Sequence, residues 1–355
     1  MSLGTRDTTL KPLETPRPWD AARQPLECVR VREETADVRT FTFRAGPGTI
    51  FRHRPGQFVT LQLPVPGGPP LHRSYTISSS PSRPFALSVT VKAQEGSVGT
   101  RWMFDHLRPG MKIRALGPMG AFVLPDPPGS EPLLLLSAGS GITPMMAMLR
   151  WCQDLAPMTD VAFVQCARTE ADLMFLDELA LMAKTMPRLR VAAVVARGTV
   201  EAPFLSGRMD MALLGLAAPD FMARRVYCCG PDGFMAAMRE GLVAGGLDPE
   251  HYAQESFGVS ETDAAPLTEG GFPIRFLVTG AEGLGDETRT ILEVARGAGV
   301  AIPSACGMGL CGTCKVRANG PVEMTHQGGI FDDEIAEGYI LACCSRPKGA
   351  VEVEA

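Results

Sequence analysis

Residues 133–152 read LLLLSAGSGITPMMAMLRWC, and this stretch decides the fold of the middle of the chain. Its first five residues are a short apolar run, which is typical of a strand buried on both faces of a parallel sheet. The turn 138–144 follows, and residues 145–152 then have helical composition. Strand, glycine turn and helix in this order let a phosphate approach the backbone at a helix N-terminus. A simple tight turn is the alternative interpretation of the glycines.

The same alternation continues after residue 152. Short apolar runs recur between helical stretches, and they predict strands at residues 161–165, 189–195 and 225–229. Strands that alternate with helices are typical of an open parallel sheet. The sequence therefore predicts an α/β domain over residues 128–257.

Residues on the N-terminal side of this domain have a different rhythm. Short alternating stretches recur between glycine and proline turns, which is typical of a small antiparallel barrel. The predicted strands lie at residues 40–43, 58–63, 74–77, 87–92 and 112–115. We expect the barrel domain over residues 23–127. Residues 1–22 hold several prolines and mixed charges without periodicity, which predicts a flexible extension.

On the C-terminal side, residues 258–271 are rich in glycine, threonine, alanine and acidic residues. This composition predicts an interdomain linker. Residues 272–355 follow, with a predicted strand at 274–278 and a predicted helix at 290–297. A domain this small has a limited core, so a cofactor bound by its cysteines would stabilise it.

Four cysteines of this third domain have an informative spacing. The segment Cys306-Gly-Met-Gly-Leu-Cys311-Gly-Thr-Cys314 is followed by Cys343 after 28 further residues. This is the C-x4-C-x2-C…C spacing of plant-type two-iron clusters. Gly307, Gly309 and Gly312 give the loop the backbone freedom that is needed to wrap a cluster and to direct N–H groups at its sulfides.

A structural zinc site is the main alternative for these cysteines. Zinc sites usually pair two short Cys-x2–4-Cys segments, whereas here one short pair precedes a single distant cysteine. The spacing therefore favours the cluster, with Cys306, Cys311 and Cys314 as three of its ligands. Spacing alone leaves both Cys343 and Cys344 open as the fourth.

Composition and charge exclude some classes of function. A net charge of −5 gives no electrostatic reason to expect a nucleic-acid partner. Apolar runs fall short of the ~18 to 20 residues needed to cross a bilayer, and the N-terminal residues lack the apolar segment of a secretory signal. The other six cysteines lack a disulfide framework and are expected as reduced thiols. We therefore expect a cytoplasmic protein without membrane or nucleic-acid partners.

Residues Arg73-Ser-Tyr-Thr76 stand at the start of a predicted barrel strand. An arginine can bind a diphosphate through charge-assisted hydrogen bonds, a tyrosine ring can stack on an isoalloxazine, and a neighbouring hydroxyl can reach flavin N5. Residues 96–100, GSVGT, precede the helical run 101–107 and offer free N–H groups and a hydroxyl to an anion. The alternatives are a surface arginine, a core tyrosine and a plain N-cap at Thr100.

Three motifs in this order resemble those of the ferredoxin-reductase flavoprotein family. They are Arg-x-Tyr-Ser/Thr at residues 73–76, the glycine turn at 96–100 and Gly-Pro-x-Gly-x-Phe at 117–122. The resemblance implies a six-stranded antiparallel β-barrel that binds FAD, with Tyr75 and Thr76 beside the reacting ring. The FAD contacts that it implies are Arg73, Ser74, Tyr75, Thr76, Val91, Lys92, Gly99 and Thr100.

The same family has Gly-x-Gly-x-x-Pro and, after a later strand, Cys-Gly-Pro in its nicotinamide domain. This chain shows the two patterns at residues 139–144 and 229–231. The resemblance implies that the Cys229 thiol lies near the nicotinamide carbon that gives up the hydride. A small buried thiol is the alternative. The nucleotide contacts that the resemblance implies are Gly139, Gly141, Thr143, Pro144, Cys229, Gly230 and Pro231.

Residues Glu255-Ser-Phe257 end the α/β domain with an acid and an aromatic ring, much as family members return to the flavin. The resemblance implies a proton-relay role for Glu255 and a stacking role for Phe257. The loop 168–172 contains two acids that would repel a 2′-phosphate, whereas Arg197 would attract one. These charges favour NADH over NADPH.

The stretch from Phe272 onward resembles a plant-type ferredoxin, including residues 302–304 before the first cysteine and 339–342 before the last. The resemblance implies an α+β ferredoxin domain of the β-grasp type, a [2Fe-2S] cluster and Cys343 as its fourth ligand. The predicted fold class is therefore multidomain, with a flavin barrel, a parallel-sheet nicotinamide domain and a ferredoxin domain.

A nicotinamide delivers two electrons together and a two-iron cluster holds one, so a flavin between them converts one mode into the other. The module order resembles reductase components of Rieske-type oxygenases, especially those that demethylate betaines and other quaternary amines. We therefore expect NADH-dependent electron transfer through FAD and a [2Fe-2S] cluster to a protein acceptor, a Rieske-type oxygenase. The alternatives are the reductase of hybrid-cluster protein or of the phenylacetyl-CoA epoxidase complex, a stand-alone diaphorase and a redox sensor.

The third domain is acidic. Residues 272–355 contain eleven acidic and seven basic side chains, so they carry −4 of the chain's −5. The densest group of acids is Asp332, Asp333 and Glu334. We interpret this group as a surface that docks on a basic patch of the partner, with a solvated loop as the alternative.

Overall fold

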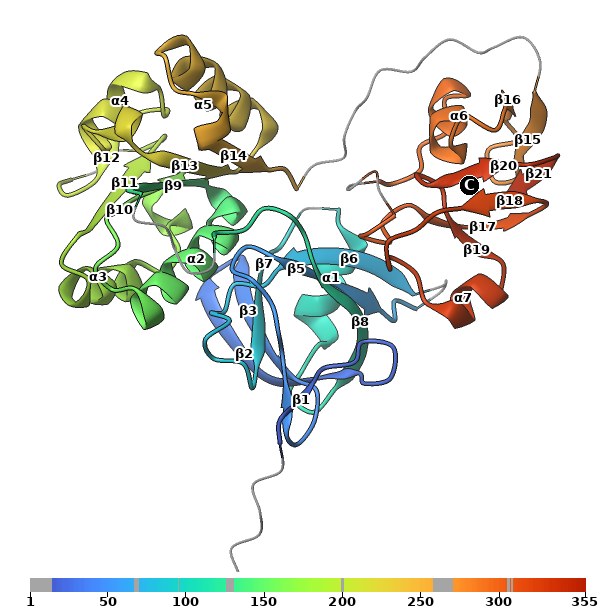
Figure 1. Cartoon of the computed structure of the whole chain (residues 1–355), viewed down its shortest axis with the longest axis horizontal. Helices are drawn as coiled ribbons and strands as arrows, with labels where there is room; N and C mark the ends of the chain where they lie inside the picture. Colours follow the sequence, from blue (N-terminus) through green and yellow to red (C-terminus); the bar gives the residue numbers. More distant parts are fainter. Residues whose placement is uncertain are drawn as a thin grey trace, which may run out of the picture.

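The computed structural model describes residues 15–66, 70–94, 96–125, 131–198, 201–257, 271–304, 307 and 309–355. Figure 1 shows three domains, with a barrel in the centre, a parallel-sheet domain on one side of it and the C-terminal domain on the other. Most of the predicted N-terminal extension and nearly all of the predicted linker lie outside the described residues.

The first domain is a six-stranded antiparallel sheet in the order β6-β5-β8-β2-β3-β7, as predicted. A bridge between Ile77 and Val89 links the end of β6 to β7 and thereby joins the two edges of the sheet. Side chains that alternate along the strands fill the interior, among them Phe41 and Leu61. The strand bounds are β1 Arg17–Pro18, β2 Leu26–Thr35, β3 Val38–Arg44, β4 Thr49–Ile50, β5 Phe58–Leu63, β6 Leu71–Thr76, β7 Leu87–Lys92 and β8 Lys112–Met119.

Helix α1 (Val98–His106) begins directly at the glycine turn that follows β7. Its N-cap is Ser97, because the Ser97 hydroxyl accepts a hydrogen bond from Thr100 N at 3.4 Å. The predicted helix start at Arg101 is therefore three residues too late, and the alternative N-cap at Thr100 is wrong. Valine and glycine have low helix propensity, so the local sequence conceals this first turn.

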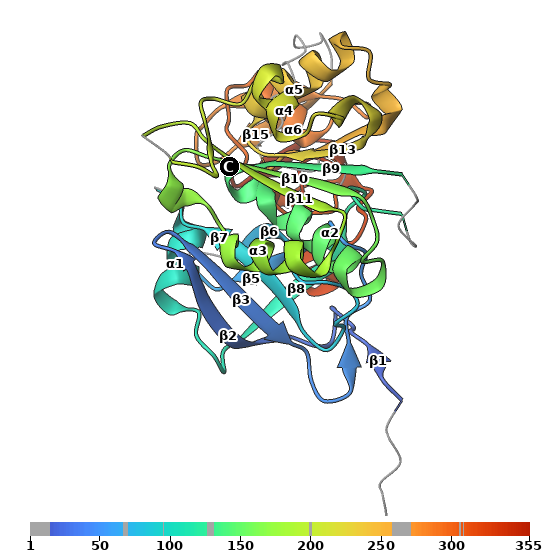
Figure 2. The same cartoon turned by 90° about the vertical axis from the view of Figure 1, so that its left-hand side faces the viewer.

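The second domain is a fully parallel sheet in the order β12-β11-β10-β9-β13-β14. Figure 2 shows α2 and α3 between this sheet and the barrel, with α4 and α5 on the opposite face. The strand order reverses between β9 and β13, and such a switch point opens a crevice at the carboxyl ends of the strands. The strand bounds are β9 Leu133–Ala138, β10 Val161–Ala167, β11 Leu189–Val195, β12 Leu205–Ser206, β13 Arg225–Cys229 and β14 Tyr252–Glu255.

The helices of this domain connect successive strands. The α-helices are α2 Ile142–Leu155, α3 Leu176–Thr185, α4 Met211–Ala217 and α5 Asp232–Ala244. Short 3-10 helices lie at η1 Gly139–Gly141, η2 Glu170–Asp172, η3 Phe221–Ala223 and η4 Pro249–His251. None of the helices in the described part of the chain is long and apolar enough to cross a membrane.

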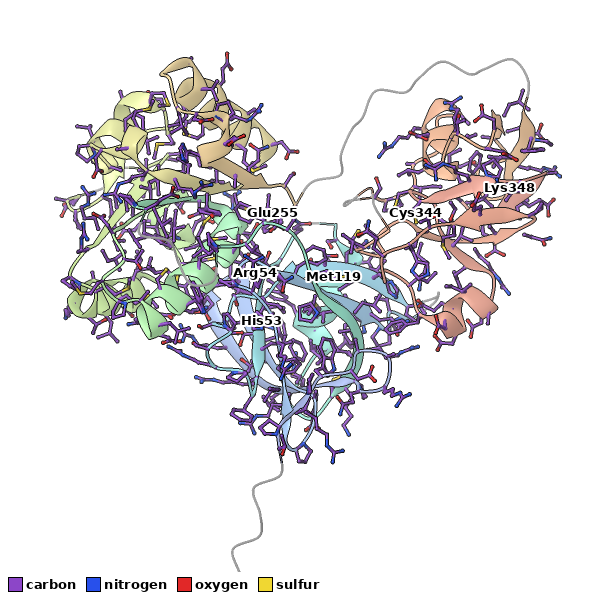
Figure 3. All side chains as sticks on the ribbon, in the orientation of Figure 1. His53, Arg54, Met119, Glu255, Cys344 and Lys348 are labelled. Carbon is purple, nitrogen blue, oxygen red and sulfur yellow. The ribbon has the colours of Figure 1, made fainter. Side chains whose placement is uncertain are left out.

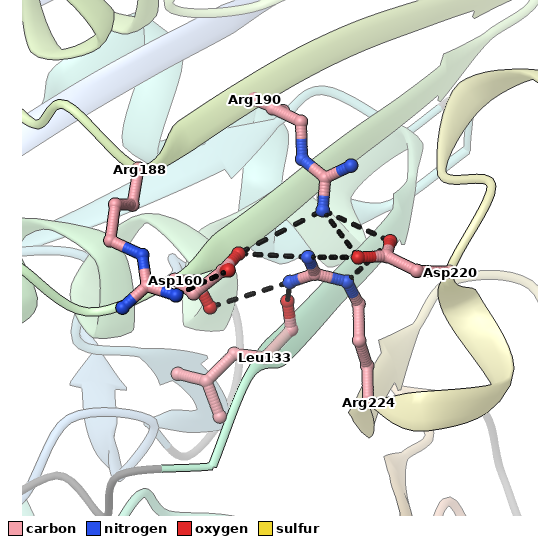
Figure 4. A network of polar contacts seen from close by, with 6 residues as sticks. All are labelled: Leu133, Asp160, Arg188, Arg190, Asp220 and Arg224. Atoms are coloured by element: carbon pink, nitrogen blue, oxygen red, sulfur yellow. Dashed lines mark hydrogen bonds and ion pairs between the residues drawn. The ribbon is translucent and has the colours of Figure 1, made fainter.

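A buried ion network holds the amino ends of β9, β10 and β13 together (Figure 4). The Arg224 side chain is 1% exposed and donates hydrogen bonds to Leu133 O at 3.0 Å, to Asp160 Oδ1 at 2.8 Å and to Asp220 Oδ2 at 2.7 Å. Arg188 and Arg190 add ion pairs at the surface. A buried charge is tolerated when it is fully paired in this way. Because the crevice opens at the other ends of the strands, this network is structural.

Polar contacts also fix the barrel against the α/β domain. Arg83 pairs with Asp154 of α2 at 2.8 Å, and Lys92 at the end of β7 pairs with Asp172 at 3.0 Å. Arg150 of α2 donates to Ser78 O, just beyond β6. These contacts bring the end of the flavin-motif strand next to the crevice of the parallel sheet.

The third domain is a five-stranded mixed sheet in the order β16-β15-β21-β17-β19, on which α6 (Ile291–Gly297) packs. Its α+β architecture agrees with the prediction. The predicted strand 274–278 starts and ends two residues early as β15, and Leu277 and Val278 lie 47% and 77% exposed in a turn. The remaining bounds are β15 Phe272–Phe276, β16 Glu282–Gly285, β17 Lys315–Asn319, β18 Val322–Met324, α7 Asp332–Ala336, β19 Tyr339–Leu341, β20 Ser345–Pro347 and β21 Val351–Val353.

Candidate active site and electron-transfer path

Strand β6 carries the predicted flavin motif along one edge of the barrel sheet. Arg73 is partly buried, and burial lowers the pKa of its guanidinium. A Cβ atom at Gly99 would lie 3.2 Å from Cγ of Arg73, so the first turn of α1 packs directly on this arginine. An anion held by the N–H groups of that turn would therefore lie next to a cation, which suits a diphosphate.

The hydroxyl of Thr100 is already engaged within the turn. It accepts a hydrogen bond from Gln94 N at 3.2 Å and donates to Ser97 O at 3.5 Å. Thr100 therefore orders the backbone of the glycine turn rather than presenting a free hydroxyl. Val91, in β7, is buried in the barrel core, whereas Lys92 reaches the crevice.

Polar atoms without partners gather where β6 meets the α/β domain. The hydroxyls of Tyr75 and Thr76 and the Oε2 atom of Glu255 are buried and lack a hydrogen bond of normal geometry to any described residue. Buried unsatisfied polar atoms are rare in folded proteins, because each costs free energy. The polar edge and the ring of a flavin would supply partners for them, so these residues fit the cofactor. Figure 3 labels Glu255 on the side of the α/β domain that faces the barrel.

Cys229 and Glu255 are register partners on β13 and β14, at the carboxyl edge of the parallel sheet. Burial raises the pKa of Glu255 to about 8, against a lowering effect from the Thr76 hydroxyl. Burial, together with the charge of Glu255, raises the pKa of Cys229 well above its ordinary value. The Cys229 thiol is fully buried and its thiolate form is disfavoured, so it does not act as a nucleophile.

His53 is a partly buried polar residue of the barrel that the sequence did not reveal. Both of its ring nitrogens are buried without a hydrogen-bond partner among the described residues, and burial lowers its pKa to about 4. It lies in the loop before β5, close to Arg54 in Figure 3. A single histidine outside any motif carries no signal in the sequence.

A cleft of about 710 Å³ opens at the switch point of the parallel sheet. Gly139 and Ser140 line it after β9, Gly230 and Pro231 line it after β13, and the half-exposed Phe257 also lines it. The volume falls within the range of small-molecule sites, and the position is the one where parallel sheets bind ligands. The residues therefore fit a dinucleotide.

Three of the predicted nucleotide residues are buried at the start of α2, where they support the cleft without lining it. A Cβ atom at Gly141 would lie 2.1 Å from Cys229 O, so only glycine lets the start of α2 pass so close to the end of β13. Thr143 and Pro144 are buried in the first turn of α2, where the Thr143 hydroxyl donates to Ser140 O at 3.1 Å.

The cleft is lined by charges of both signs. Its cations are Lys92, Arg168 and Arg208, and its acids are Asp172 and Asp232. Burial alone would raise the pKa of Asp172, but hydrogen bonds from Lys92, Thr169 and Arg168 hold that pKa well below its ordinary value. The Asp172 carboxylate is thus satisfied within the protein, which the local sequence did not indicate because Lys92 lies 80 residues away.

The cluster loop has the backbone that its glycines predicted. Gly307, Gly309 and Gly312 have φ angles of 66°, 69° and 68°, in the left-handed region that favours glycine. Among the predicted ligands, Cys311, Cys314 and Cys343 are buried, and Cys306 lies outside the described residues.

The two adjacent cysteines have different surroundings. Gly309 N donates a hydrogen bond to Cys343 Sγ at 3.3 Å, and Cys343 N donates to Cys314 Sγ at 3.4 Å. Backbone N–H groups that point at sulfur suit a cluster ligand. Cys344 Sγ also lies against the loop, 2.6 Å from where a Cβ atom of Gly309 would be, but its backbone partner is Leu341 O, to which it donates at 3.6 Å. The convergence of thiols and N–H groups fits a [2Fe-2S] cluster.

The cluster loop lies directly against the flavin-motif strand. Ser74 Oγ is 3.5 Å from Cys311 O, which joins the residue between Arg73 and Tyr75 to a predicted cluster ligand. A Cβ atom at Gly312 would lie 2.6 Å from Nδ1 of His72, two residues before Ser74. One short strand therefore links the predicted flavin and cluster positions.

Three known domain families match the chain in the order of the three folded units. The oxidoreductase FAD-binding domain matches residues 25–124, the oxidoreductase NAD-binding domain residues 135–240 and the 2Fe-2S iron-sulfur cluster binding domain residues 282–348. The fold and the site thus define an oxidoreductase that uses FAD, a nicotinamide dinucleotide and a [2Fe-2S] cluster, as predicted.

Relatives that match over nearly their whole length show which kind of oxidoreductase this chain is similar to. The chain is 48% identical to the stachydrine N-demethylase reductase subunit Stc4 of Rhizobium meliloti (strain 1021), over 95% of this chain and 98% of the relative. It is 40% identical to the glycine betaine monooxygenase reductase subunit of Pseudomonas aeruginosa (strain UCBPP-PA14), over 97% and 98%. The chain belongs to the family of reductase subunits of demethylase and monooxygenase systems.

A solved structure shares the three-domain fold. Phthalate dioxygenase reductase, described as a modular structure for electron transfer from pyridine nucleotides to [2Fe-2S], superimposes with a TM-score of 0.58. The match covers 93% of this chain and 97% of that chain at 24% identity, so it shows the fold alone.

Proposed function

We propose that this chain supplies electrons to the Rieske-type oxygenase of a system that demethylates a quaternary amine. The observation that carries the proposal is the likeness, over nearly the whole chain, to reductase subunits of stachydrine and glycine betaine systems. The described part of the chain agrees with it, because the cluster loop belongs to the separate C-terminal domain and lies against the flavin-motif strand. A protein acceptor would take electrons from that domain.

We further propose the roles of the site residues. Arg73 and the first turn of α1 would hold the FAD diphosphate, and Tyr75 and Thr76 would orient the flavin ring. Cys229 would position the nicotinamide, while Glu255 would hold a proton at Oε2 beside the reacting edge. Bound FAD supplies the conversion between two-electron and one-electron transfer, and the cluster supplies one-electron storage.

The division into domains is part of the same proposal. We assign residues 23–127 to FAD, 128–257 to the nucleotide and 272–355 to the cluster. The four cluster ligands would be Cys306, Cys311, Cys314 and Cys343. Reduced thiols and an iron–sulfur site suit a reducing compartment, so we propose a cytoplasmic location.

NADH is the proposed electron donor. The cleft has three cationic and two acidic side chains, and this surplus of one positive charge does not fully offset even the two negative charges of the pyrophosphate that both nucleotides share. An additional 2′-phosphate would lack a counter-charge. We expect a higher kcat/KM with NADH than with NADPH, and Arg208→Ala should weaken the binding of both alike. A selective loss of NADPH use in that variant would contradict this assignment.

Reconstitution tests the proposed acceptor. The purified protein is mixed with NADH, the Rieske-type oxygenase of a quaternary-amine demethylase and either stachydrine or glycine betaine. We expect NADH oxidation to be coupled to oxygen uptake and to formaldehyde release, the product of an oxidised methyl group. Cys311→Ser is the control that should abolish this coupling while ferricyanide reduction persists. Fast reduction of quinones without stimulation by any oxygenase would instead support the diaphorase alternative.

A further inference from the structure

Glu334, at the start of α7, is the centre of a buried polar cluster between the third domain and the barrel. Its side chain is 7% exposed, and Oε1 accepts hydrogen bonds from Gln62 Nε2 at 2.7 Å and from Lys315 Nζ at 2.6 Å. His72 Nε2 lies 3.3 Å from the same oxygen. Two of these partners, Gln62 and His72, belong to barrel strands, so the cluster spans the two domains.

All three ionisable members of this cluster are buried, because the His72 and Lys315 side chains are 2% and 6% exposed. A buried ion pair of this kind contributes little net stability, but removing one partner leaves an uncompensated charge. The arrangement is therefore sensitive to geometry. The polar cluster therefore favours one position of the third domain on the barrel, which we call its seating, over slightly shifted positions.

A second contact at the edge of this interface restricts the same seating. Arg114 of β8 donates to both carboxylate oxygens of Asp333, at 2.8 and 3.2 Å. Its guanidinium also lies 3.8 Å from the centre of the Phe331 ring. A planar guanidinium that is held by a carboxylate and a ring together fixes orientation as well as distance.

These contacts change the interpretation of the acidic group that the sequence singled out. Asp333 and Glu334 face the protein's own barrel, and only Asp332 is exposed without a described side-chain partner. The predicted docking of all three acids on a partner is therefore wrong for the seating seen here. Asp332 is adjacent to Asp333 and Glu334 in the sequence, but on helix α7 it faces solvent, whereas the other two acids contact the barrel.

We propose that the interface of Glu334, His72, Lys315, Gln62, Asp333 and Arg114 is a positioning latch, which seats the cluster loop against β6 for electron transfer from the flavin. The latch touches the cluster loop through His72 and Gly312, and β6 continues from His72 to Tyr75. This seating would hold a cluster bound by the loop beside β6, where bound flavin would supply it with one electron at a time. Glu334 is thus a positioning residue, and the inference rests on the cofactors rather than on the proposed oxygenase.

Anaerobic rapid mixing of the FAD- and cluster-loaded protein with one equivalent of NADH tests this role, because flavin and cluster reduction have separate absorbance changes. We expect Glu334→Gln to slow cluster reduction roughly tenfold or more, since a small misplacement has a large effect on rate. Flavin reduction, FAD content and the EPR spectrum of the reduced cluster should stay unchanged. Asp332→Asn, on the same helix but outside the interface, is the matched control and should leave both rates unchanged.

Two further variants change residues of the barrel. Their effect on cluster reduction therefore does not depend on whether Glu334→Gln disturbs the folding of the third domain. His72→Gln and Arg114→Ala alter the same interface by substitutions in the barrel and leave the sequence of the cluster domain unchanged, and each should also slow cluster reduction. Hydrogen exchange supplies a readout besides electron transfer, because residues 71–76 and 331–336 should exchange faster in all three latch variants. Unchanged cluster reduction in His72→Gln and Arg114→Ala would overturn the proposal, whatever Glu334→Gln does.

Discussion

Glu255 occupies a position where its negative charge is costly. Its pKa in the folded protein is about 8, raised from an ordinary value of 4.5 by burial. Between these two values the unfolded chain releases the proton and the folded protein retains it. Folding stability is therefore full below pH 4.5, falls as the pH rises toward 8 and then levels off.

Glu255→Gln should remove this dependence on pH. We expect the variant to equal the parent in stability near pH 4.5 and to exceed it by about 1 to 4 kcal/mol above pH 8, since each unit of pKa shift corresponds to roughly 1.4 kcal/mol. Denaturant unfolding of the FAD-loaded proteins at several pH values measures the difference. A difference that does not change with pH would show that Glu255 is ionised in the folded state.

Cys343 and Cys344 are adjacent, yet their sulfur atoms form hydrogen bonds with different backbone groups. Cys343→Ser should lose the cluster and the transfer of electrons to a protein acceptor, because it removes a proposed ligand. NADH-dependent ferricyanide reduction should persist, since the flavin remains reducible. Cys344→Ala should retain both iron and activity. Iron analysis and EPR of the purified variants check this, and loss of the cluster in Cys344→Ala would assign the ligand to that residue.

At the scale of elements, the packing of α2 against the end of β13 builds the nucleotide cleft. Gly141→Ala places a methyl group against the carbonyl of Cys229, and backbone atoms cannot move aside as a flexible side chain does. We expect a loss of about 1 to 3 kcal/mol in stability, as for other overpacked sites, together with weaker nucleotide binding. Chemical denaturation and NADH titration measure the two effects.

Gly233, in the first turn of α5, provides the matched control for that substitution. A Cβ atom there would meet nothing within 4 Å. Gly233→Ala should therefore be neutral or stabilising by up to about 1 kcal/mol, because alanine restricts the unfolded chain. Equal losses in the two variants would mean that the close approach of Gly141 to β13 has no energetic importance.

At the scale of the whole molecule, the third domain keeps an acidic surface outside the latch. Exposed acids such as Asp332 and Glu337 remain available to a basic partner. Partner-dependent turnover should fall several-fold between roughly 0.05 and 0.3 M salt, because screening shortens the range of attraction. Ferricyanide reduction should not fall in parallel, since its acceptor is an anion.

The double variant Asp332→Asn/Glu337→Gln should flatten the salt dependence with the partner, while cluster reduction by NADH stays unchanged. Steady-state turnover across a salt series measures the first effect, and rapid mixing measures the second. An unchanged salt slope would remove these two acids from the docking surface. A change in cluster reduction would instead place them in the latch.

Local patterns in the sequence determined the three domain classes and their order. The apolar run before Gly139, the alternation in the barrel and the cysteine spacing each depend on residues that are near one another in the chain. Strand period, turn geometry and metal ligation act over such short distances, so a sequence records them directly. The bounds of β5, β7, β11 and β13 agree with the sequence for the same reason.

Only the tertiary structure decided how the parts meet. Lys92 forms an ion pair with Asp172, and Gly141 packs against Cys229. Glu334 accepts a hydrogen bond from Gln62, which lies 272 residues away in the sequence. No periodicity or motif encodes such pairs, because a local pattern describes each partner only within its own segment. Spatial neighbours then determine what each group does, so that Asp333 and Glu334, which resemble a docking surface in the sequence, become contacts between two domains of one chain. The physical reason is that charge and burial act between neighbours in space, and the sequence lists neighbours along the chain.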